Sequence, residues 1–232
     1  MKVVILQPSY IPWRGYFNQI YQADLFIFYD DVQYDKHGWR NRNQIKTSQG
    51  AQWLTIPVHS KGVTEGIPIK DVRIDWSKKW AKKHLKSLKF SYAKAPYLKK
   101  HFSWLEKIYA RQDEFLADFT IETTIELAGI LGIEDTKFMR SSSLEGINGT
   151  KTDRLIQILE KVGTTHYMSG PSAKDYIENK KFEEAKISLE FFKYDYPPYE
   201  QLHPPFNPHI SILDLLFMEG ENALNFIKKQ EK

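Results

Sequence analysis

Apolar positions in the first thirty residues follow a strand, helix, strand order. Residues 2–7 (KVVILQ) and 24–29 (DLFIFY) are short runs rich in β-branched and aromatic residues, followed by a proline and by two aspartates. Continuous apolar runs of this length are typical of strands that are buried on both faces. Between them, Phe17 and Ile20 fall at helical spacing within 13–22. The pattern predicts a βαβ unit, the building block of a parallel sheet.

The period changes in the middle of the chain. Residues 38–58 alternate as a hairpin does, around a turn at 48–50, and 67–74 (IPIKDVRI) is interpreted as another strand. From about residue 76 to 131, apolar residues recur every three to four positions, which predicts a helical insertion. The last of its helices is expected over about 113–131.

The C-terminal part returns to an alternation of strands and helices. Strands are predicted at 136–140, 165–169 and 187–194, and an amphipathic helix at 151–162. A proline-rich segment then precedes two short predicted helices, at 209–218 and 220–229. No repeat or linker divides the sequence. We therefore expect one α/β domain over residues 1–232, with three to five parallel strands at its core.

The composition fits a globular protein. The chain has 232 residues, of which 41% are apolar and 27% charged, and its mean hydropathy is −0.52. No apolar run approaches the roughly 18 residues of a membrane-spanning helix. The apolar run at the start is also too short for a secretory signal, so we expect a cytoplasmic protein. The absence of cysteine excludes disulfides, cysteine-ligated zinc and a thiol nucleophile.

Charge and aromatic content favour an anionic ligand with a flat ring. The net charge is +4, and 14% of the residues are aromatic, which suits nucleotides or sugars. A run of lysines between residues 76 and 100 is interpreted as the solvent-exposed face of a helix, and a nucleic-acid-binding stripe is the minority alternative. We therefore expect a small-molecule partner and no nucleic acid.

The loop after the first predicted strand is the first candidate site. It contains Gln7, Tyr10, Trp13 and Gly15, and it leads into the first helix. In open α/β sheets, ligands bind beyond the carboxyl ends of the strands, where a helix N-terminus favours an anion. The structural alternative is a rigid proline turn whose tyrosine and tryptophan belong to the core.

Two aspartates, Asp30 and Asp31, follow the second predicted strand. Carboxylates at this position can hold a magnesium ion, accept a hydrogen bond from ribose or act as a general base. The alternative is a solvated turn in which one aspartate caps a backbone amide. Neighbours in a strand point to opposite faces, so at most one of the two should face the cleft, and we predict that this is Asp31.

Arg40, Asn41 and Arg42 form the third candidate site. Arginine binds phosphate or carboxylate with a forked pair of hydrogen bonds, and asparagine binds hydroxyls and amides. In a strand, Arg40 and Arg42 would share one face, and Trp39, Asn41 and Asn43 would lie on the other, so that one face could be a ligand wall. An exposed hairpin without a ligand is the alternative.

Two C-terminal segments complete the candidates. Ser169, Gly170 and Ser172 lie at a strand–turn–helix junction, whose hydroxyls and free amides can cradle a phosphate or a sugar hydroxyl. A simple helix cap is the alternative there. Gln201 and His203 lie in the proline-rich segment, and His203 is a second candidate for an acid or base. The histidines of this segment lack the i, i+4 spacing of a helical zinc pair, so no metal site is predicted.

Several segments, taken together, resemble the WbqC-like protein family. In order, they read QPSYIPWRGYFNQI, DDVQY, WRNRNQI, WLTIPV, YMSGPSAKDYI and YEQLHPPFNPHISILDLLFMEG. The resemblance runs from Ile5 to Gly220, and the segments follow the order of the family. Members tend to lie among genes for bacterial surface polysaccharides, such as the O-antigen of lipopolysaccharide. The resemblance therefore implies a role in making or decorating a sugar nucleotide.

The opening strand, loop, helix and strand also resemble class I nucleotidylyltransferases and pantothenate synthetase. This second resemblance implies a parallel sheet of the nucleotidylyltransferase or HUP-like class. Those proteins carry a His-x-Gly-His signature at the start of the first helix. Here the stretch reads Trp-Arg-Gly-Tyr, so Gly15 is kept and both histidines are absent. The resemblance supports a shared fold and argues against adenylyl transfer.

These observations give one favoured function and two alternatives. The favoured function is transfer of an acyl or aminoacyl group to a nucleotide-linked amino sugar. Trp13 and Tyr10 would stack on the base or sugar, and Arg40 or Arg42 would bind the pyrophosphate. The general base would be Asp31 or His203. The alternatives are adenylation or nucleotidyl transfer with ATP and magnesium, and non-catalytic binding of a sugar nucleotide or a partner protein. Homo-oligomer formation is left open.

Overall fold

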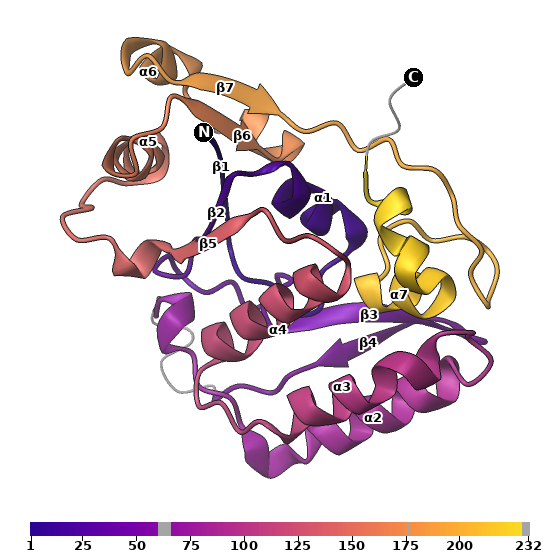
Figure 1. Ribbon diagram of the computed structural model, residues 1–232. Helices are drawn as coiled ribbons and strands as arrows, with labels where there is room; N and C mark the ends of the chain where they lie inside the picture. Colours follow the sequence, from indigo (N-terminus) through magenta and orange to yellow (C-terminus); the bar gives the residue numbers. More distant parts are fainter. Residues whose placement is uncertain (60–65, 176, 229–232) are drawn as a thin grey trace.

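The protein is built around a parallel sheet, as the sequence predicts. The computed structural model describes residues 1–59, 66–175 and 177–228 (Figure 1). Its main sheet has five parallel strands in the order β5-β2-β1-β6-β7. The strands are β1 (Lys2–Leu6), β2 (Leu25–Phe28), β5 (Lys137–Arg140), β6 (His166–Ser169) and β7 (Ser188–Phe191). The predicted α/β class with a parallel core is confirmed.

Helices cover both faces of this sheet. Val4 and Phe26 belong to one core cluster, together with side chains of α1 (Arg14–Gln22) and α4 (Leu116–Ile130). Their neighbours Val3 and Leu25 belong to a second cluster, with α5 (Lys151–Lys161) and α6 (Asn179–Glu184). Because both faces are buried, β1 and β2 are apolar at nearly every position rather than at every second one.

The order of the strands places a crevice beside β1. Strands β2 and β5 lie on one side of β1, and β6 and β7 lie on the other. Along the chain, β2 and β5 are added on one side of β1, and β6 and β7 are then added on the other side. The order of the strands therefore reverses between β1 and β6. In open α/β sheets, the loops that follow the two strands at such a switch point diverge. A ligand binds in the crevice between them, at the carboxyl ends of the strands.

The remaining elements form a layer beside the sheet. A two-stranded antiparallel hairpin joins β3 (Arg42–Thr47) to β4 (Gly50–Thr55), which confirms the predicted excursion and its turn. In the lower part of Figure 1 the hairpin lies next to three further helices. They are α2 (Trp80–Ser91), α3 (Leu98–Ala110) and α7 (Ile212–Glu219). Together with α4, helices α2 and α3 confirm the predicted helical segment at about 76–131.

The prediction of a strand at 67–74 is wrong. The segment contains a 3-10 helix, Ile69–Asp71, flanked by isolated one-residue bridges at Pro68 and Ile74. Its backbone amides bond to separate partners: Ile69 N–H donates to the carbonyl of Val32, and Ile74 N–H to that of Glu114. No single neighbouring strand runs alongside the segment in the described chain. Its alternating apolar residues therefore pack against the rest of the protein without forming a ladder of β-sheet hydrogen bonds.

Several predicted helices differ in their bounds or type, and the one predicted at 209–218 spans Ile212–Glu219. The helix expected from about residue 113 begins at Leu116, because Phe115 is held extended by a bridge to Arg73. The last predicted helix, 220–229, is a 3-10 helix over Gly220–Phe226.

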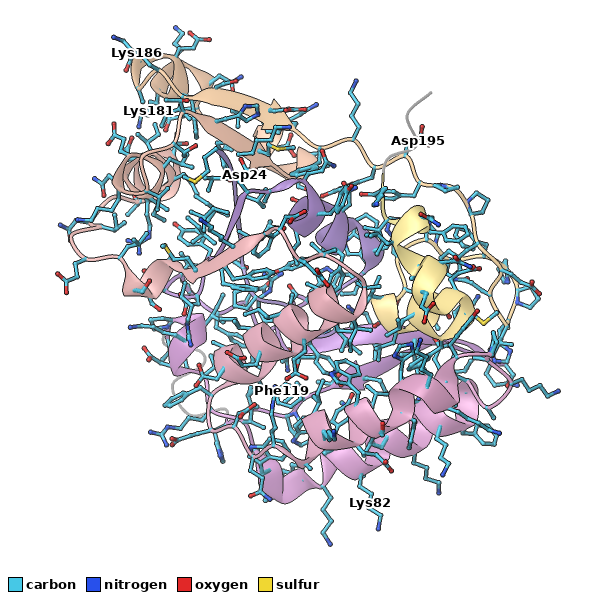
Figure 2. All side chains as sticks on the ribbon, in the orientation of Figure 1. Asp24, Lys82, Phe119, Lys181, Lys186 and Asp195 are labelled. Atoms are coloured by element: carbon cyan, nitrogen blue, oxygen red, sulfur yellow. The ribbon has the colours of Figure 1, made fainter. Side chains whose placement is uncertain are left out.

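The lysines of α2 form its solvent-exposed face, as predicted. Figure 2 shows Lys82 extending away from the helical layer, whereas Phe119 of α4 lies among interior side chains. Trp80, His84 and Leu88 occupy the opposite, buried face of α2. The run of lysines thus follows from the amphipathic pattern of the helix.

Candidate functional site

A cavity of about 660 Å³ opens at the carboxyl ends of β1 and β6. Its walls come from segments far apart in the sequence, which the topology brings to one edge of the sheet. Six of the residues predicted from the sequence line it: Gln7, Trp13, Arg40, Ser169, Gly170 and Ser172. The cavity therefore lies at the switch point, where a ligand is expected.

Trp13 forms an aromatic wall of the cavity. Its ring stands edge-on to Tyr194, with ring centroids 4.9 Å apart, and its centroid lies 5.1 Å from that of His209. Gly15 is absent from the described lining, but it determines this placement: a Cβ atom at Gly15 would lie 2.3 Å from the Trp13 ring. Only a glycine lets the indole fold back over the first turn of α1 in this way.

Tyr10 lies behind the cavity, in the core. Its hydroxyl is 2.9 Å from Nδ1 of His84 and also contacts the hydroxyl of Tyr109. Burial raises the pKa of Tyr10 and lowers the pKa of His84 to about 4, so both are neutral at pH 7. Its hydroxyl is thus engaged inside the protein, and Tyr10 is not among the described residues that line the cavity.

The two arginines predicted to share one face diverge. Strand β3 begins only at Arg42, so Arg40 precedes the strand and the alternation rule does not relate them. Arg40 lines the cavity near Tyr16 and Tyr34. The Arg42 guanidinium instead lies 4.5 Å from the centre of the Trp53 ring and donates to the carbonyl of His37.

The Arg40 side chain has no hydrogen-bond or ion-pair partner within the described residues. Its Nε atom is buried without an acceptor, and burial lowers the pKa of its guanidinium. Asp35 attracts this cation but forms no ion pair or hydrogen bond with it, so the guanidinium is well placed to receive an anionic ligand from the cavity. Its neighbour Asn41 is engaged structurally, since the Asn41 amide donates to the carbonyl of Ile56 over 2.8 Å.

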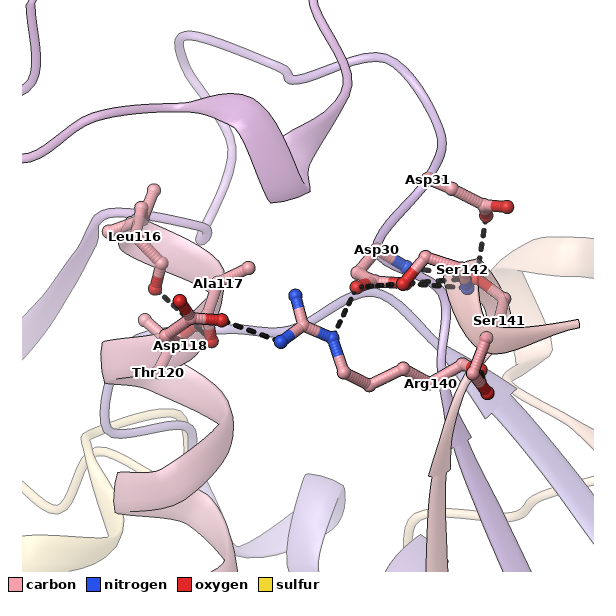
Figure 3. Close-up of polar contacts among 10 residues, drawn as sticks. Asp30, Asp31, Leu116, Ala117, Asp118, Thr120, Arg140, Ser141 and Ser142 are labelled. Carbon is pink, nitrogen blue, oxygen red and sulfur yellow. Dashed lines mark hydrogen bonds and ion pairs between the residues drawn. The ribbon is translucent and has the colours of Figure 1, made fainter. Parts of the chain in front are cut away.

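Asp30 is fully buried and forms part of a polar network (Figure 3). Its carboxylate accepts hydrogen bonds from Nε of Arg140, over 2.6 Å, and from the backbone and hydroxyl of Ser142. Arg140 also pairs with Asp118 of α4, over 2.5 Å. The network ties the end of β2 to β5 and α4.

Asp31 is engaged on the other side of the same turn. It accepts from the Ser141 hydroxyl over 2.6 Å and pairs with Arg154 of α5 over 2.5 Å. Neither Asp30 nor Asp31 is among the described residues that line the cavity. The catalytic role of Asp31 stays a prediction, and its carboxylate would have to leave Arg154 to take a proton.

Gln201 and His203 support the proline-rich segment. The Gln201 amide donates to the Tyr199 hydroxyl and to the carbonyl of Asn207, over 3.0 Å each. Nε2 of His203 lies 3.2 Å from the carbonyl of Ser91. The described lining of the cavity includes neither residue, so the catalytic role of His203 also stays a prediction.

Several lining residues were not predicted from the sequence, among them Gln19, Lys151, Tyr194 and His209. Two of them had a usable signal. Gln19 is four residues after Gly15 and so lies on the same face of α1. Tyr194 follows β7, so the rule for carboxyl ends of strands applies to it too. Lys151 and Arg40 are the two cations of the described lining, which contains no aspartate or glutamate.

The lining does not fit a magnesium ion held by protein carboxylates. Magnesium in nucleotide sites is usually held by one or two carboxylates together with substrate phosphates. The described part of the cavity wall offers no such ligand, and nowhere in the described chain do three His, Asp or Glu side chains lie together as a metal site.

Among the described helices, none is long and apolar enough to cross a bilayer.

Comparison with known proteins gives a family and one relative without a known role. The family model of the WbqC-like protein family matches residues 7–226. The chain is 42% identical to "Uncharacterized protein Rv1507c" of Mycobacterium tuberculosis (strain ATCC 25618 / H37Rv) over 229 residues, which are 98% of this chain and 97% of the relative. No solved structure matches.

Proposed function

The chain belongs to the WbqC-like protein family, and we propose that it transfers an acyl or aminoacyl group to a nucleotide-linked amino sugar bound in the cavity between β1 and β6. The resemblance described above links such proteins to surface polysaccharides, for which nucleotide-linked sugars are the activated building blocks. The geometry of the cavity supports a ligand of this size, because pockets of about 300–1,000 Å³ are usual for small molecules and cofactors.

The observation that carries the proposal is the unpartnered Arg40 guanidinium. It lines the cavity, and its buried Nε has no acceptor within the described chain. Lys151 adds a second cation to the same wall, and no carboxylate of the described lining opposes them. A pyrophosphate supplies the missing acceptors, and a forked arginine–phosphate contact is charge-assisted. The Trp13 ring is placed to pack against a base or sugar ring.

The proposed reaction is an acyl transfer. The sugar amine attacks the carbonyl carbon of an activated acyl or aminoacyl donor, a C–N bond forms, and the bond from that carbon to the donor's leaving atom breaks. The amine proton passes to a base and then to the leaving group. Asp31 and His203 are the bases predicted from the sequence. His209 is the histidine of the described lining, next to Trp13, and is a third candidate.

A thermal-shift panel of nucleotide sugars, nucleotides and free sugars tests the proposal, because a ligand that binds the folded state raises its melting temperature. At least one nucleotide sugar should bind, and the matching free sugar should bind far more weakly. Arg40→Lys should weaken binding, and Arg40→Ala should weaken it by roughly tenfold to a hundredfold, from the loss of about 1.5–3 kcal/mol.

Arg42 is the matched control, because its guanidinium packs on Trp53 outside the described lining. Arg42→Lys should leave nucleotide-sugar affinity unchanged. If the free sugar binds as tightly as its nucleotide conjugate, or if Arg40→Ala binds like wild type, the phosphate site is not at Arg40 and the proposal is wrong.

Non-catalytic binding of a nucleotide sugar is the second candidate. One observation favours it: Asp31, the carboxylate predicted to act as the base, is engaged by Arg154. Incubation of the bound nucleotide sugar with acyl thioester and aminoacyl donors, followed by mass spectrometry, separates the two. An acylated sugar nucleotide supports the transferase. Tight binding without product from any donor supports the binding protein.

A further inference from the structure

Gln19 lies in α1 and reaches the cavity with a fixed orientation of its amide. The residue is 3% exposed and lines the cavity. Its Nε2 donates to the Tyr194 hydroxyl over 2.8 Å and to the carbonyl of Gly15 over 3.4 Å. A backbone carbonyl can only accept a hydrogen bond. The Gly15 contact therefore requires the nitrogen on that side and places the oxygen, Oε1, on the other.

Oε1 of Gln19 is a buried acceptor without a donor in the described chain. Buried polar atoms are nearly always hydrogen-bonded, and an unsatisfied one is costly. A Cβ atom added at Gly170 would lie 3.5 Å from the Tyr194 hydroxyl and 3.9 Å from Oε1. Gly170, Tyr194 and Gln19 all line the cavity. The free acceptor thus lies beside Gly170, within the wall of the cavity.

We propose that Oε1 of Gln19 determines ligand specificity by accepting a hydrogen bond from an N–H or O–H group of the bound nucleotide sugar. The inference rests on the proposed function for the identity of the ligand. Arg40 then binds an anionic group of the ligand, and Gln19 binds a donor group. Two parts of a nucleotide sugar carry such donors: the N–H edge of the base, and the hydroxyl or amide groups of the sugar.

The expected consequence is discrimination between ligands. A buried site built to bond a ligand N–H or O–H rejects an analogue that lacks this group, because its own polar atom is then left unpaired. A ligand that provides the donor completes the Gln19 amide. It leaves the contacts of Nε2 with Gly15 and Tyr194 in place.

Two variants separate the free acceptor from the rest of the amide. Gln19→Met keeps the length of the side chain and removes both polar atoms. Tyr194→Phe removes the partner of Nε2 and leaves Oε1 in place. The probes are UDP-N-acetylglucosamine, dTDP-glucose, GDP-mannose, ADP-glucose and CMP-linked sialic acid, each with its parent nucleotide, titrated by calorimetry. Urea melts of each variant report folding.

Gln19→Met should bind the tightest probe at least tenfold more weakly than wild type, whereas Tyr194→Phe should lose less than threefold. If the parent nucleotide loses affinity as the sugar conjugate does, the donor belongs to the base. If only the conjugate loses affinity, the donor belongs to the sugar. Either pattern supports the proposal.

Two results overturn it, and they can be told apart. If a probe binds wild type and Gln19→Met equally well, the Gln19 inference is wrong and the proposed function stands. The same holds if Tyr194→Phe reproduces the whole effect, since Gln19 then acts by holding Tyr194. If none of the probes binds wild type, the proposed function is wrong, and the inference that rests on it falls too.

Discussion

At Gly15 the absence of a side chain decides where the Trp13 ring lies. A Cβ atom there would be 2.3 Å from the indole, so Gly15→Ala must displace the ring. We predict that Gly15→Ala weakens nucleotide-sugar binding by roughly tenfold to a hundredfold, which corresponds to losing about 1–3 kcal/mol of stacking. Overpacking should also lower the free energy of unfolding by about 1–3 kcal/mol. Calorimetry and a urea melt measure the two effects.

Gly129 provides the matched control, because it also lies in a helix and a Cβ atom added there meets nothing within 4 Å. Gly129→Ala should raise the free energy of unfolding by about 0.5–1 kcal/mol, from helix propensity alone, and leave binding unchanged. Wild-type affinity in Gly15→Ala would contradict a role for Trp13 as a wall of the site.

His84 makes stability depend on pH. Burial lowers its pKa to about 4 in the folded protein, against about 6.5 in the unfolded chain. Between these values the unfolded chain binds a proton that the folded protein does not, so stability rises with pH. We predict that His84 contributes a loss of up to about 3 kcal/mol in unfolding free energy as the pH falls from 7 to 4. Urea melts at several pH values measure this slope.

His84→Gln should flatten that slope, because glutamine does not titrate in this range. Glutamine also keeps an acceptor for the Tyr10 hydroxyl, which lies 2.9 Å from the histidine ring. His37→Gln, at an exposed position, is the control and should keep the wild-type slope. An unchanged slope in His84→Gln would show that another group causes the acid sensitivity.

Single residues of the site could be predicted where a rule links sequence to position. The cavity is lined by Gln7, Trp13 and Ser169. Each of them lies at the end of a strand or helix that the sequence predicts. Gln19 was missed because its importance lies in an atom without a partner, and the sequence does not show partners. Tyr10 has the same aromatic character as Trp13, and only packing against His84 separates their positions.

At the scale of elements, the turn after β2 tests whether its two aspartates differ in role. Asp30 is fully buried and is bonded by Arg140 and Ser142. We predict that Asp30→Asn lowers the free energy of unfolding by about 1–3 kcal/mol, because the amide nitrogen cannot accept the hydrogen bonds that Arg140 and Ser142 donate to the carboxylate. Asp31→Asn should cost less, because the Asp31 carboxylate is less buried than that of Asp30 and accepts fewer hydrogen bonds. Urea melts measure both.

The same pair of variants tests the predicted base. If Asp31 takes a proton in the reaction, Asp31→Asn should lower turnover by about 10²-fold or more, and Asp30→Asn should not once its folded fraction is accounted for. Equal, small effects of both variants on turnover would mean that the two aspartates only hold β2 to its neighbours.

Strands and helices were predicted correctly where the spacing of apolar residues matches the alternation of a paired strand or the turn of a helix. Strands β1, β2, β5 and β6 are short apolar or alternating runs bounded by turns, and the prediction located each of them. The segment 67–74 has the same pattern but no neighbouring strand in the described chain. Its hydrogen bonds go to separate places such as Val32 and Glu114. Whether an alternating segment becomes a strand depends on distant partners.

At the scale of the molecule, the arrangement of the site followed from topology more than from motif. The rule that ligands bind at the carboxyl ends of parallel strands predicts a common edge for the loops after β1 and β6, and the cavity lies there. The rule failed for Arg42, because the hairpin is outside the main sheet and its first residue turns toward Trp53. A pattern of charges in a sequence does not say which charge faces the cavity.

Charge is unevenly distributed over the molecule. Residues 76–110 contain ten lysines and one glutamate, a net charge of +9, whereas the whole chain carries +4. The remainder therefore carries −5. The lysines of α2 are exposed, and its first turn has no acidic residue to complement the helix dipole. None of the described lining of the cavity comes from α2 or α3, so this basic surface and the ligand site can be changed independently.

We predict that this surface is solvated and that its lysines repel one another. The double variant Lys82→Glu, Lys83→Glu places two carboxylates in the first turn of α2, each three or four residues from a remaining lysine. Its free energy of unfolding should rise by about 0.5–1.5 kcal/mol, because like charges are removed, new i, i+4 pairs form and the helix dipole is complemented. The neutral variant Lys82→Gln, Lys83→Gln should gain about half as much. Both should bind the nucleotide sugar as wild type does.

Fluorescence anisotropy with single- and double-stranded RNA at 150 mM salt tests the alternative, that this basic surface binds nucleic acid. If wild type binds RNA specifically and the glutamate variant does not, this surface is a nucleic-acid site rather than the solvent-exposed face of a helix.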